Sequence, residues 1–205
     1  MNARRGCGCG CGGLVVLLLA LAAAAYFLVY RPVTVFLNGW RAPAQTSSTA
    51  VPAAGGNVNA PLARSDVQKF VRIRRDERAA LGSSFASVEN TFQRLQDGQT
   101  PGLWQVTGVL RDLGNSVGQA RAAQTAGLAR EQLSRERFNV IAGDVNRALG
   151  VPDIDFGKIA SDVQRGRVPD FDTAVRTQAS PQTKALIEPF KSELTATAAL
   201  GLLGL

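Results

Sequence analysis

The chain has 205 residues, enough for one domain with appendages, and its composition already excludes several kinds of function. It contains no histidine, which excludes an imidazole base, a histidine-based catalytic triad and a histidine-ligated metal. The net charge is +7, but Arg4, Arg5, Arg31 and Arg41 all precede the first acidic residue, Asp66, so the basic character belongs partly to the N-terminus. Aromatic residues are sparse while alanine, leucine and valine are plentiful, which favours helices over a β-sandwich.

The first predicted element is an apolar helix near the N-terminus. Residues 14–30 are uncharged, and seventeen helical residues span roughly 25 Å, near the lower limit for crossing the core of a bilayer. Arg31 and Pro32 interrupt the run, but apolar residues continue beyond them, and three aromatic residues suit the membrane interface: Tyr26, Tyr30 and Trp40. We therefore predict a transmembrane anchor with its interface over residues 14–40.

A cleavable signal peptide is the alternative for the same segment. Arg4 and Arg5 would form its charged region, residues 14–25 its apolar region, and the Ala-Leu-Ala at residues 20–22 its cleavage pattern. The anchor is preferred because apolar residues persist well beyond these alanines. Charges on the two sides of the segment are nearly balanced, with a slight bias toward a cytoplasmic N-terminus, so we expect the following domain to be extracytoplasmic.

Residues 1–13 form a basic tract rich in glycine and cysteine. It holds all three cysteines, Cys7, Cys9 and Cys11, so the rest of the chain has no disulfide framework. One chain offers no fourth ligand for zinc, and we assign no metal and no cofactor. Lipidation, a metal site shared between chains and a redox contact remain open beside a flexible interfacial spacer.

Residues 41–62 are predicted to be a flexible linker. They contain three prolines, a glycine pair and a run of polar residues, with no apolar periodicity. Twenty or so flexible residues span roughly 25 Å, which would let the following domain stand clear of the lipid surface.

Residues 63–205 are predicted to form an all-α soluble domain that begins with two long helices. Ser65 is expected to cap the first helix, and Thr100 to cap the second, with Pro101 in its first turn. The first helix has a heptad seam of apolar residues: Leu81, Phe85, Val88, Phe92 and Leu95. The second has a matching seam: Leu103, Val106, Leu110, Leu113, Val117 and Ala120.

Equal seams joined by a short turn near residues 98–101 indicate an antiparallel hairpin. In the expected register Leu81 faces Val117, and Arg74 faces Gln124. Several glycines fall inside the second helix, and a close approach of a neighbouring helix would compensate for their low helix propensity, although flexibility is an alternative.

Further short helices complete the predicted bundle. Ser134 caps a third helix that Gly150 ends, and Ser180 with Pro181 opens a last helix that is bent at Pro189. Between them a Val-Pro-Asp motif occurs twice, at residues 151–155 and 168–172, and each copy is expected to start a short helix. The apolar C-terminus, residues 200–205, is too short to span a bilayer, so we expect it to pack on the bundle or on a neighbouring chain.

The densest basic cluster consists of Arg72, Arg74, Arg75 and Arg78. At about 100° per helical residue, Arg72 and Arg75 are expected to point outward, and Arg74 and Arg78 toward the apolar seam. An unpaired buried guanidinium is costly. We therefore predict that Arg74 or Arg78 is buried and hydrogen-bonded, either to helix-terminal carbonyls or to one of three side chains: Gln124, Glu131 or Asp144. Such a contact would fix helix register, and without acceptors the arginine would instead bind an acidic ligand.

The carboxylates do not indicate a catalytic or metal site. The aspartate pairs at residues 153/155 and 170/172 lack the further ligands of a calcium loop and are more simply helix caps. No pair among Glu131, Glu136 and Asp144 has the spacing of a glycosidase, and the sequence has neither a phosphate-binding glycine loop nor a serine nucleophile motif.

These features favour a membrane-anchored, extracytoplasmic binding or scaffolding protein of a bacterial-type cell envelope, with no catalysis of its own. Its expected partners are membrane lipid and either a protein or a second copy of the chain. The alternative is a membrane-tethered protein that binds anionic lipid or nucleic acid through segment 72–78. Nucleic acid is the less favoured ligand because no aromatic residues alternate with these arginines to stack on bases. An enzyme with carboxylate or arginine chemistry is the third and weakest hypothesis.

Overall fold

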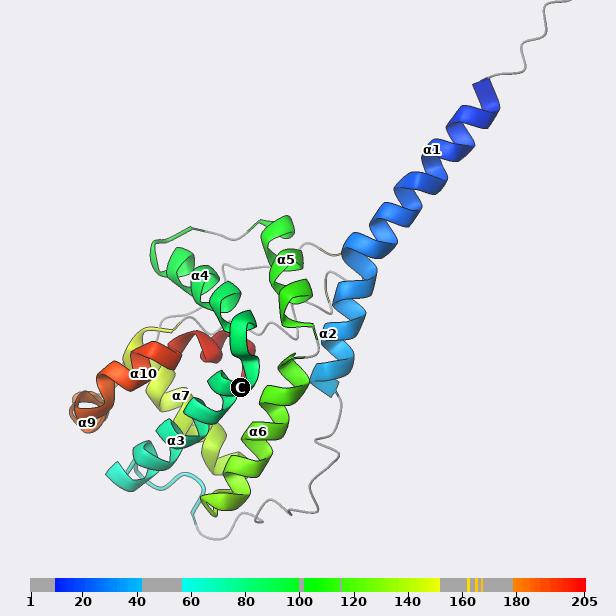
Figure 1. The fold of residues 1–205 in the computed structure, drawn as a ribbon. Helices are drawn as coiled ribbons and strands as arrows, with labels where there is room; N and C mark the ends of the chain where they lie inside the picture. Colours follow the sequence, from blue (N-terminus) through cyan, green and yellow to red (C-terminus); the bar gives the residue numbers. More distant parts are fainter. Residues whose placement is uncertain are drawn as a thin grey trace, which may run out of the picture.

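The computed structural model describes residues 10–41, 57–99, 102–114, 116–151 and 179–205, together with Asp162, Arg165 and Arg167. Within these residues the regular structure is entirely helical, which confirms the predicted all-α fold (Figure 1). A long helix projects from one end of a compact bundle. The three cysteines, almost all of the two Val-Pro-Asp motifs and most of the predicted linker lie outside the described residues, so the expectations for them stay predictions.

The N-terminal helix is continuous from α1 (Gly10–Ala25) through a π-helical turn (Tyr26–Tyr30) into α2 (Arg31–Arg41). The π-turn lies directly before Pro32, and in it the N–H of Arg31 donates to the carbonyl of Tyr26. Such a turn is a local adjustment that lets a helix continue through a proline, which has no N–H and crowds the preceding turn. One candidate membrane span, Val15–Asn38, lies in this helix.

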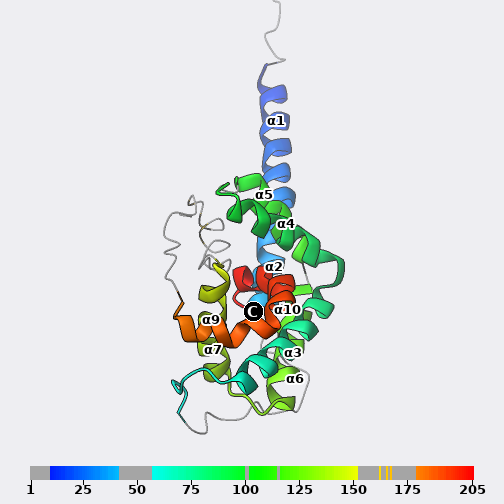
Figure 2. The same cartoon turned by 90° about the vertical axis from the view of Figure 1, so that its left-hand side faces the viewer.

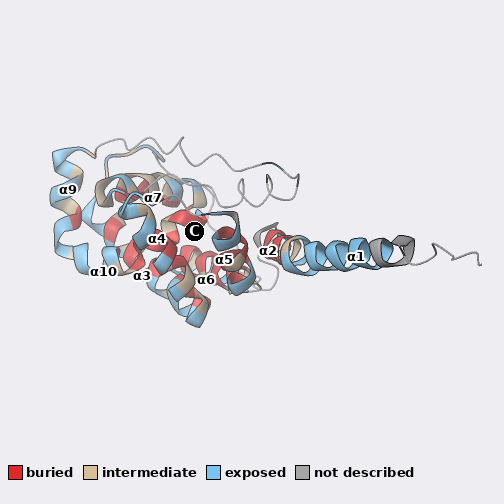
Figure 3. Cartoon of the chain, turned by 90° about the horizontal axis from the view of Figure 1, so that it is seen from above, coloured by how far each residue is buried: buried red, intermediate tan, exposed pale blue. Residues whose placement is uncertain are grey.

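The two halves of this long helix have different surroundings. Apart from Val29, the large apolar side chains described from Val15 to Tyr30 are exposed, whereas α2 buries Val33, Phe36 and Leu37 in the bundle (Figure 3). α2 packs directly against α5 and α6, so this end of the N-terminal helix is part of the bundle. Most of the predicted linker lies outside the described residues, and the expected distance of the domain from the lipid surface stays a prediction.

The end of the predicted linker is also held by the domain. Arg137 donates hydrogen bonds to the carbonyls of Val58, Ala60 and Pro61, at 2.9, 2.6 and 3.2 Å, and to the Asp66 carboxylate at 2.5 Å. The guanidinium thus satisfies three backbone acceptors in a segment without regular structure. Residues 57–62 consequently belong with the domain.

The predicted hairpin is present, but each of its arms is divided in two. The first arm consists of α3 (Arg64–Leu81), a 3-10 turn (Gly82–Ser84) and α4 (Phe85–Gln96), and the second of α5 (Leu103–Leu113) and α6 (Ser116–Arg130). α3 packs along α6, and α4 packs on α5.

Glycines in the left-handed region mark the two breaks. Gly82 has φ +55° and Gly114 has φ +38°, and both values favour glycine over any residue with a Cβ. The heptad seams run straight through these positions, so the periodicity of the sequence does not reveal the breaks.

Two of the predicted helix starts are wrong by two residues. α3 is capped at Ala63, whose N–H donates to the Asp66 carboxylate at 3.2 Å, and Ser65 lies inside the helix. α5 begins after Gly102, whose N–H donates to the Gln105 side chain, and Thr100 and Pro101 precede it outside the described residues. In both cases a side chain in the first turn satisfies the N–H of the capping residue, as in the second half of a capping box.

The later helices follow the prediction. Ser134 caps α7 (Arg135–Leu149), and Gly150 ends it in the left-handed conformation. Ser180 caps α9 (Pro181–Ile187), and a 3-10 turn at Glu188–Phe190, which contains Pro189, separates it from α10 (Lys191–Thr197).

The C-terminus ends in a further 3-10 segment, Ala198–Leu203. Four apolar residues of this end are buried in the bundle: Leu200, Leu202, Leu203 and Leu205. The expectation that the apolar C-terminus packs on the bundle is confirmed.

Two apolar clusters hold the bundle together. The first, which we call the anchor-side core, joins α2, the end of α3, α4, α5, the first half of α6, Val151 and the C-terminus. The second, the far-side core, joins α3, α7, α9, α10 and the end of α6. The two cores lie in sequence along the bundle, with the anchor-side core next to the projecting helix (Figures 1 and 2).

Candidate arginine-rich site

All four predicted arginines lie on α3, but only one of them is buried. Arg74 is 2% exposed, whereas Arg72, Arg75 and Arg78 are exposed. The exposure of Arg72 and Arg75 and the burial of Arg74 agree with the expected orientations. Arg78 is exposed rather than buried, but its guanidinium lies over the ring of Phe85, a residue of the expected seam, 4.7 Å from its centroid.

Arg74 belongs to a buried polar layer that crosses three helices. Its Nη1 donates to Oε2 of Glu77 at 3.2 Å, and Oε1 of Glu77 accepts from Gln124 Nε2 at 2.9 Å. The other end of the Gln124 amide accepts from Arg135 Nη1 at 3.0 Å, and Arg135 also donates to the hydroxyl of Thr125. This polar layer therefore links α3, α6 and α7.

The layer confirms part of the prediction and corrects the rest. Arg74 is buried, and Gln124 lies in the same layer, as the register of the hairpin implies. The acceptor of the Arg74 guanidinium is Glu77, and not Gln124, Glu131 or Asp144. Glu77 is fully buried and lies three residues further along the same helix. That i,i+3 spacing is the signal in the sequence that would have identified the acceptor.

Two aromatic rings complete the environment of Arg74. Its guanidinium carbon lies 4.7 Å from the centroid of Phe70 and 5.8 Å from that of Phe138, and the two rings are 5.2 Å apart. A guanidinium over ring faces gains cation–π attraction, most strongly where water is excluded. Nη2 of Arg74 is the one buried side-chain polar atom in the described residues without a hydrogen-bond partner.

Burial controls the electrostatics of this layer. It raises the pKa of Glu77 and lowers that of Arg74, while their mutual attraction and the Gln124 hydrogen bond oppose the shift of the carboxyl. A buried pair of this kind adds little net stability, because desolvation offsets most of the attraction, but removing one partner is costly. Since Arg74 has its acceptor, the geometry fits a contact that fixes helix register rather than an empty ligand site.

The exposed arginines are mostly neutralised by carboxylates. Arg72 forms a two-pronged pair with Glu131, at 3.0 and 2.6 Å, and Arg75 pairs with Glu193 at 2.5 Å. The hydrogen bond from Arg72 lowers the pKa of Glu131. Asp144, the other carboxylate considered for the buried arginine, pairs with Arg147.

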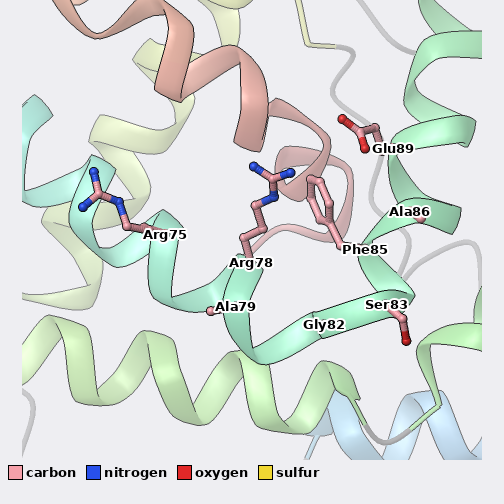
Figure 4. Close-up of a pocket in the computed structure, with 8 residues that line it drawn as sticks. All are labelled: Arg75, Arg78, Ala79, Gly82, Ser83, Phe85, Ala86 and Glu89. Atoms are coloured by element: carbon pink, nitrogen blue, oxygen red, sulfur yellow. The ribbon is translucent and has the colours of Figure 1, made fainter.

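Arg78 is the member of the cluster without a carboxylate partner in the described part of the chain. It lines an open groove of about 460 Å³ at the break between α3 and α4, together with Arg75, Phe85 and Glu89 (Figure 4). Figure 4 shows the Arg78 guanidinium beside the Phe85 ring, with Glu89 across the groove on α4. The groove thus presents the Arg78 guanidinium to solvent, while the Glu89 carboxylate in its lining would repel an anion.

The cluster lies away from the projecting helix. α3 occupies the far side of the bundle, whereas the end of α4 and the start of α5 lie at the end from which α1 emerges (Figures 1 and 2). The described residues thus define a helical protein with one candidate membrane-spanning helix and a paired arginine cluster. A comparison with known protein families, curated proteins and solved structures finds no match to this chain.

Proposed function

We propose that this chain is a single-pass membrane protein that binds or scaffolds a partner without a catalytic step of its own, and whose helical domain is held directly against the bilayer surface. The observation that carries the proposal is the continuous helix formed by α1, the π-turn and α2. One end of it is apolar and exposed, and the other is built into the anchor-side core.

The exposed half of the helix supports insertion into lipid. Between Val15 and Tyr30 the large apolar side chains are 47 to 67% exposed, apart from Val29, which packs against the anchor-side core. An apolar surface of this extent is unfavourable in water and is typical of a membrane or protein contact. It carries no charge and forms the first part of the candidate membrane span Val15–Asn38.

The buried half supports scaffolding at a fixed distance from the membrane. Val33 and Phe36 are fully buried, so α2 has no freedom to act as a tether. In this proposal the N-terminus is cytoplasmic and the domain extracytoplasmic, which follows the slight charge bias across the anchor. The partner is a protein or a second copy of the chain, because the paired arginines leave little net charge to attract a polyanion.

Fractionation of the full-length protein tests this proposal. After alkaline carbonate extraction we expect the intact protein to stay with the membrane, and we expect external protease to digest the domain in spheroplasts. Release of the intact protein into the soluble fraction would contradict the anchor, and complete protection of the domain would contradict the orientation.

Arg78, which has no carboxylate partner among the described residues, favours a second candidate, which is binding of an anionic lipid or a nucleic acid by segment 72–78. If this candidate is correct, binding should increase as the salt concentration is lowered and should be lost in the Arg78→Ala variant. Arg111 is also exposed, so Arg111→Ala serves as the control. Equal binding by wild type and the Arg78 variant would dispose of this candidate.

A further inference from the structure

Trp104 has an environment that the proposed function does not yet explain. It lies in the first turn of α5 and is 71% exposed. Among the described residues, every other exposed large hydrophobic side chain belongs to the N-terminal helix between residues 15 and 30. A tryptophan presents a large apolar ring system with one N–H donor, and leaving it in water forfeits the free energy of burial.

The helix that carries Trp104 in its first turn belongs to the end of the bundle next to the projecting helix. α5 packs on α2, and Val106 and Val109 of α5 share the anchor-side core with Val33. Val29, in the π-turn, packs against the same core. Both views of the ribbon place the start of α5 at the end of the bundle from which α1 emerges (Figures 1 and 2).

The length of the exposed helix fixes where the bilayer surface must lie. Because α2 is buried in the domain, the uncharged stretch that remains for lipid is residues 14–30. Seventeen helical residues span about 25 Å, slightly less than the roughly 30 Å hydrocarbon core. The whole uncharged stretch is therefore needed to cross the hydrocarbon core. The bilayer boundary then falls at the π-turn, where the domain begins.

We propose that Trp104 is a second contact with the same bilayer, inserted at the level of the phospholipid headgroups beside the anchor. This inference rests on the proposed membrane anchoring. Tyr26 and Tyr30, which are 51 and 50% exposed, face the same boundary from the helix itself. Aromatic side chains concentrate at this depth because the ring prefers the apolar side while its polar group stays hydrated.

The contact has a mechanical consequence. A single helix fixes the distance of a domain from the bilayer but leaves its tilt free. A second contact on α5 restrains the tilt, so that the domain is held in one orientation relative to the bilayer.

Depth-dependent fluorescence quenching tests the inference on the full-length protein in phospholipid vesicles. The chain has two tryptophans, so Trp40→Phe leaves Trp104 as the sole reporter. We expect a blue-shifted emission, with stronger quenching by lipids brominated near the headgroup than by lipids brominated near the bilayer centre. A water-like emission maximum without quenching by either lipid would overturn the inference.

A matched reporter separates this inference from the anchor on which it rests. In a chain that carries Trp40→Phe, Trp104→Phe and Tyr30→Trp, the new tryptophan reports insertion of the helix itself. If it is quenched by brominated lipid and Trp104 is not, the anchor stands and the second contact is wrong. If neither is quenched, the proposed function fails as well. A Trp104 that is blue-shifted but unquenched by lipid would mean that another protein surface covers it, which also contradicts the lipid contact.

Discussion

The two cores of the bundle are closed in different ways. The anchor-side core is closed by elements from both ends of the chain, α2 and the C-terminal leucines, and the two charged side chains buried in the described residues, Arg74 and Glu77, lie beside the other core. The far-side core borders a buried polar layer in which Arg74, Glu77 and Gln124 meet. Folding of the domain therefore involves the N-terminal helix at one end of the molecule, while buried polar contacts link α3, α6 and α7 at the other.

This difference makes each core vulnerable to a different kind of substitution. Loss of volume should damage the anchor-side core, because close-packed apolar side chains have no polar contact to fall back on. Loss of one partner from a charged pair should damage the far-side core, because the remaining charge is left buried.

The largest expected effect is on the anchor-side core. Phe36→Ala should lower the free energy of unfolding by about 3–5 kcal/mol, because it removes a fully buried ring. Phe27→Ala, on the exposed half of the same helix, is the matched control and should change the stability of the domain little. Urea denaturation of the two variants in detergent micelles measures the difference. Equal effects would mean that α2 is not part of the core.

An effect of similar size is expected in the polar layer of the far-side core. Arg74→Met should cost about 3–5 kcal/mol, because it leaves the Glu77 carboxylate buried without its cation. The double variant Arg74→Met/Glu77→Leu removes both charges and should recover most of this loss. Thermal unfolding of the single and double variants checks the expectation. A single variant as stable as the double would show that the two side chains do not form a buried ion pair.

Two glycines give a smaller contrast between the cores. A Cβ at Gly127 would lie 3.0 Å from Cγ1 of Ile73, so α3 and α6 approach closely there, and Gly127→Ala should cost about 1–3 kcal/mol through overpacking. A Cβ at Gly108, in α5, would meet nothing within 4 Å. Gly108→Ala should therefore raise stability by up to about 1 kcal/mol through helix propensity. Chemical denaturation of both variants measures the change in the free energy of unfolding, which should have opposite signs. A destabilising effect of Gly108→Ala would contradict the open space at that position.

The smallest effects concern pH, and they have opposite signs at two carboxylates. The pKa of Glu131 is lowered from its ordinary value near 4.5, chiefly by the hydrogen bond from Arg72. The ionised Glu131 thus contributes to the stability of the folded state above pH 4.5, and this contribution is lost as the pH falls through the lowered pKa. The pair is partly exposed, so we expect Glu131→Gln to cost at most about 1 kcal/mol at neutral pH, and less in acid.

Glu77 should show the reverse dependence. Burial raises its pKa, so the folded state takes up a proton before the unfolded chain does, and stability increases as the pH falls from the raised pKa toward 4.5. The free energy of unfolding of wild type, Glu77→Gln and Glu131→Gln should be measured over a range of pH. The difference from wild type should change with pH in opposite directions for the two variants. If both differences changed in the same direction, the difference in burial between the two carboxylates would be contradicted.

The sequence predicts the elements of this fold better than the contacts between their polar groups. Apolar periodicity identifies the hairpin and its register, since Leu81 and Val117 are both buried in the anchor-side core. The same periodicity does not reveal the breaks at Gly82 and Gly114. The apolar residues keep their heptad spacing through both positions, although the two glycines have positive φ values.

Burial of the second half of the N-terminal helix could not be predicted from composition. Val33, Phe36 and Leu37 suit lipid and a protein core equally well, and only the packing of α5 and α6 distinguishes them. In the arginine cluster, helical geometry predicts that Arg74 is buried but does not specify its acceptor. The acceptor depends on which carboxylate reaches it, and Glu77 does so from the same helix.

The central claim is that α2 belongs to the folded domain. Two soluble truncations test it directly, one beginning at Arg31 and the other at Asn57, compared by thermal unfolding with far-ultraviolet circular dichroism. Burial of each large apolar side chain contributes about 1.5–3 kcal/mol, so loss of Val33, Phe36 and Leu37 should remove most of the stability of a small domain. We predict cooperative unfolding for the chain that begins at Arg31, and a much lower melting temperature or no cooperative transition for the chain that begins at Asn57. Equal melting temperatures would show that the domain folds without α2 and would contradict the account.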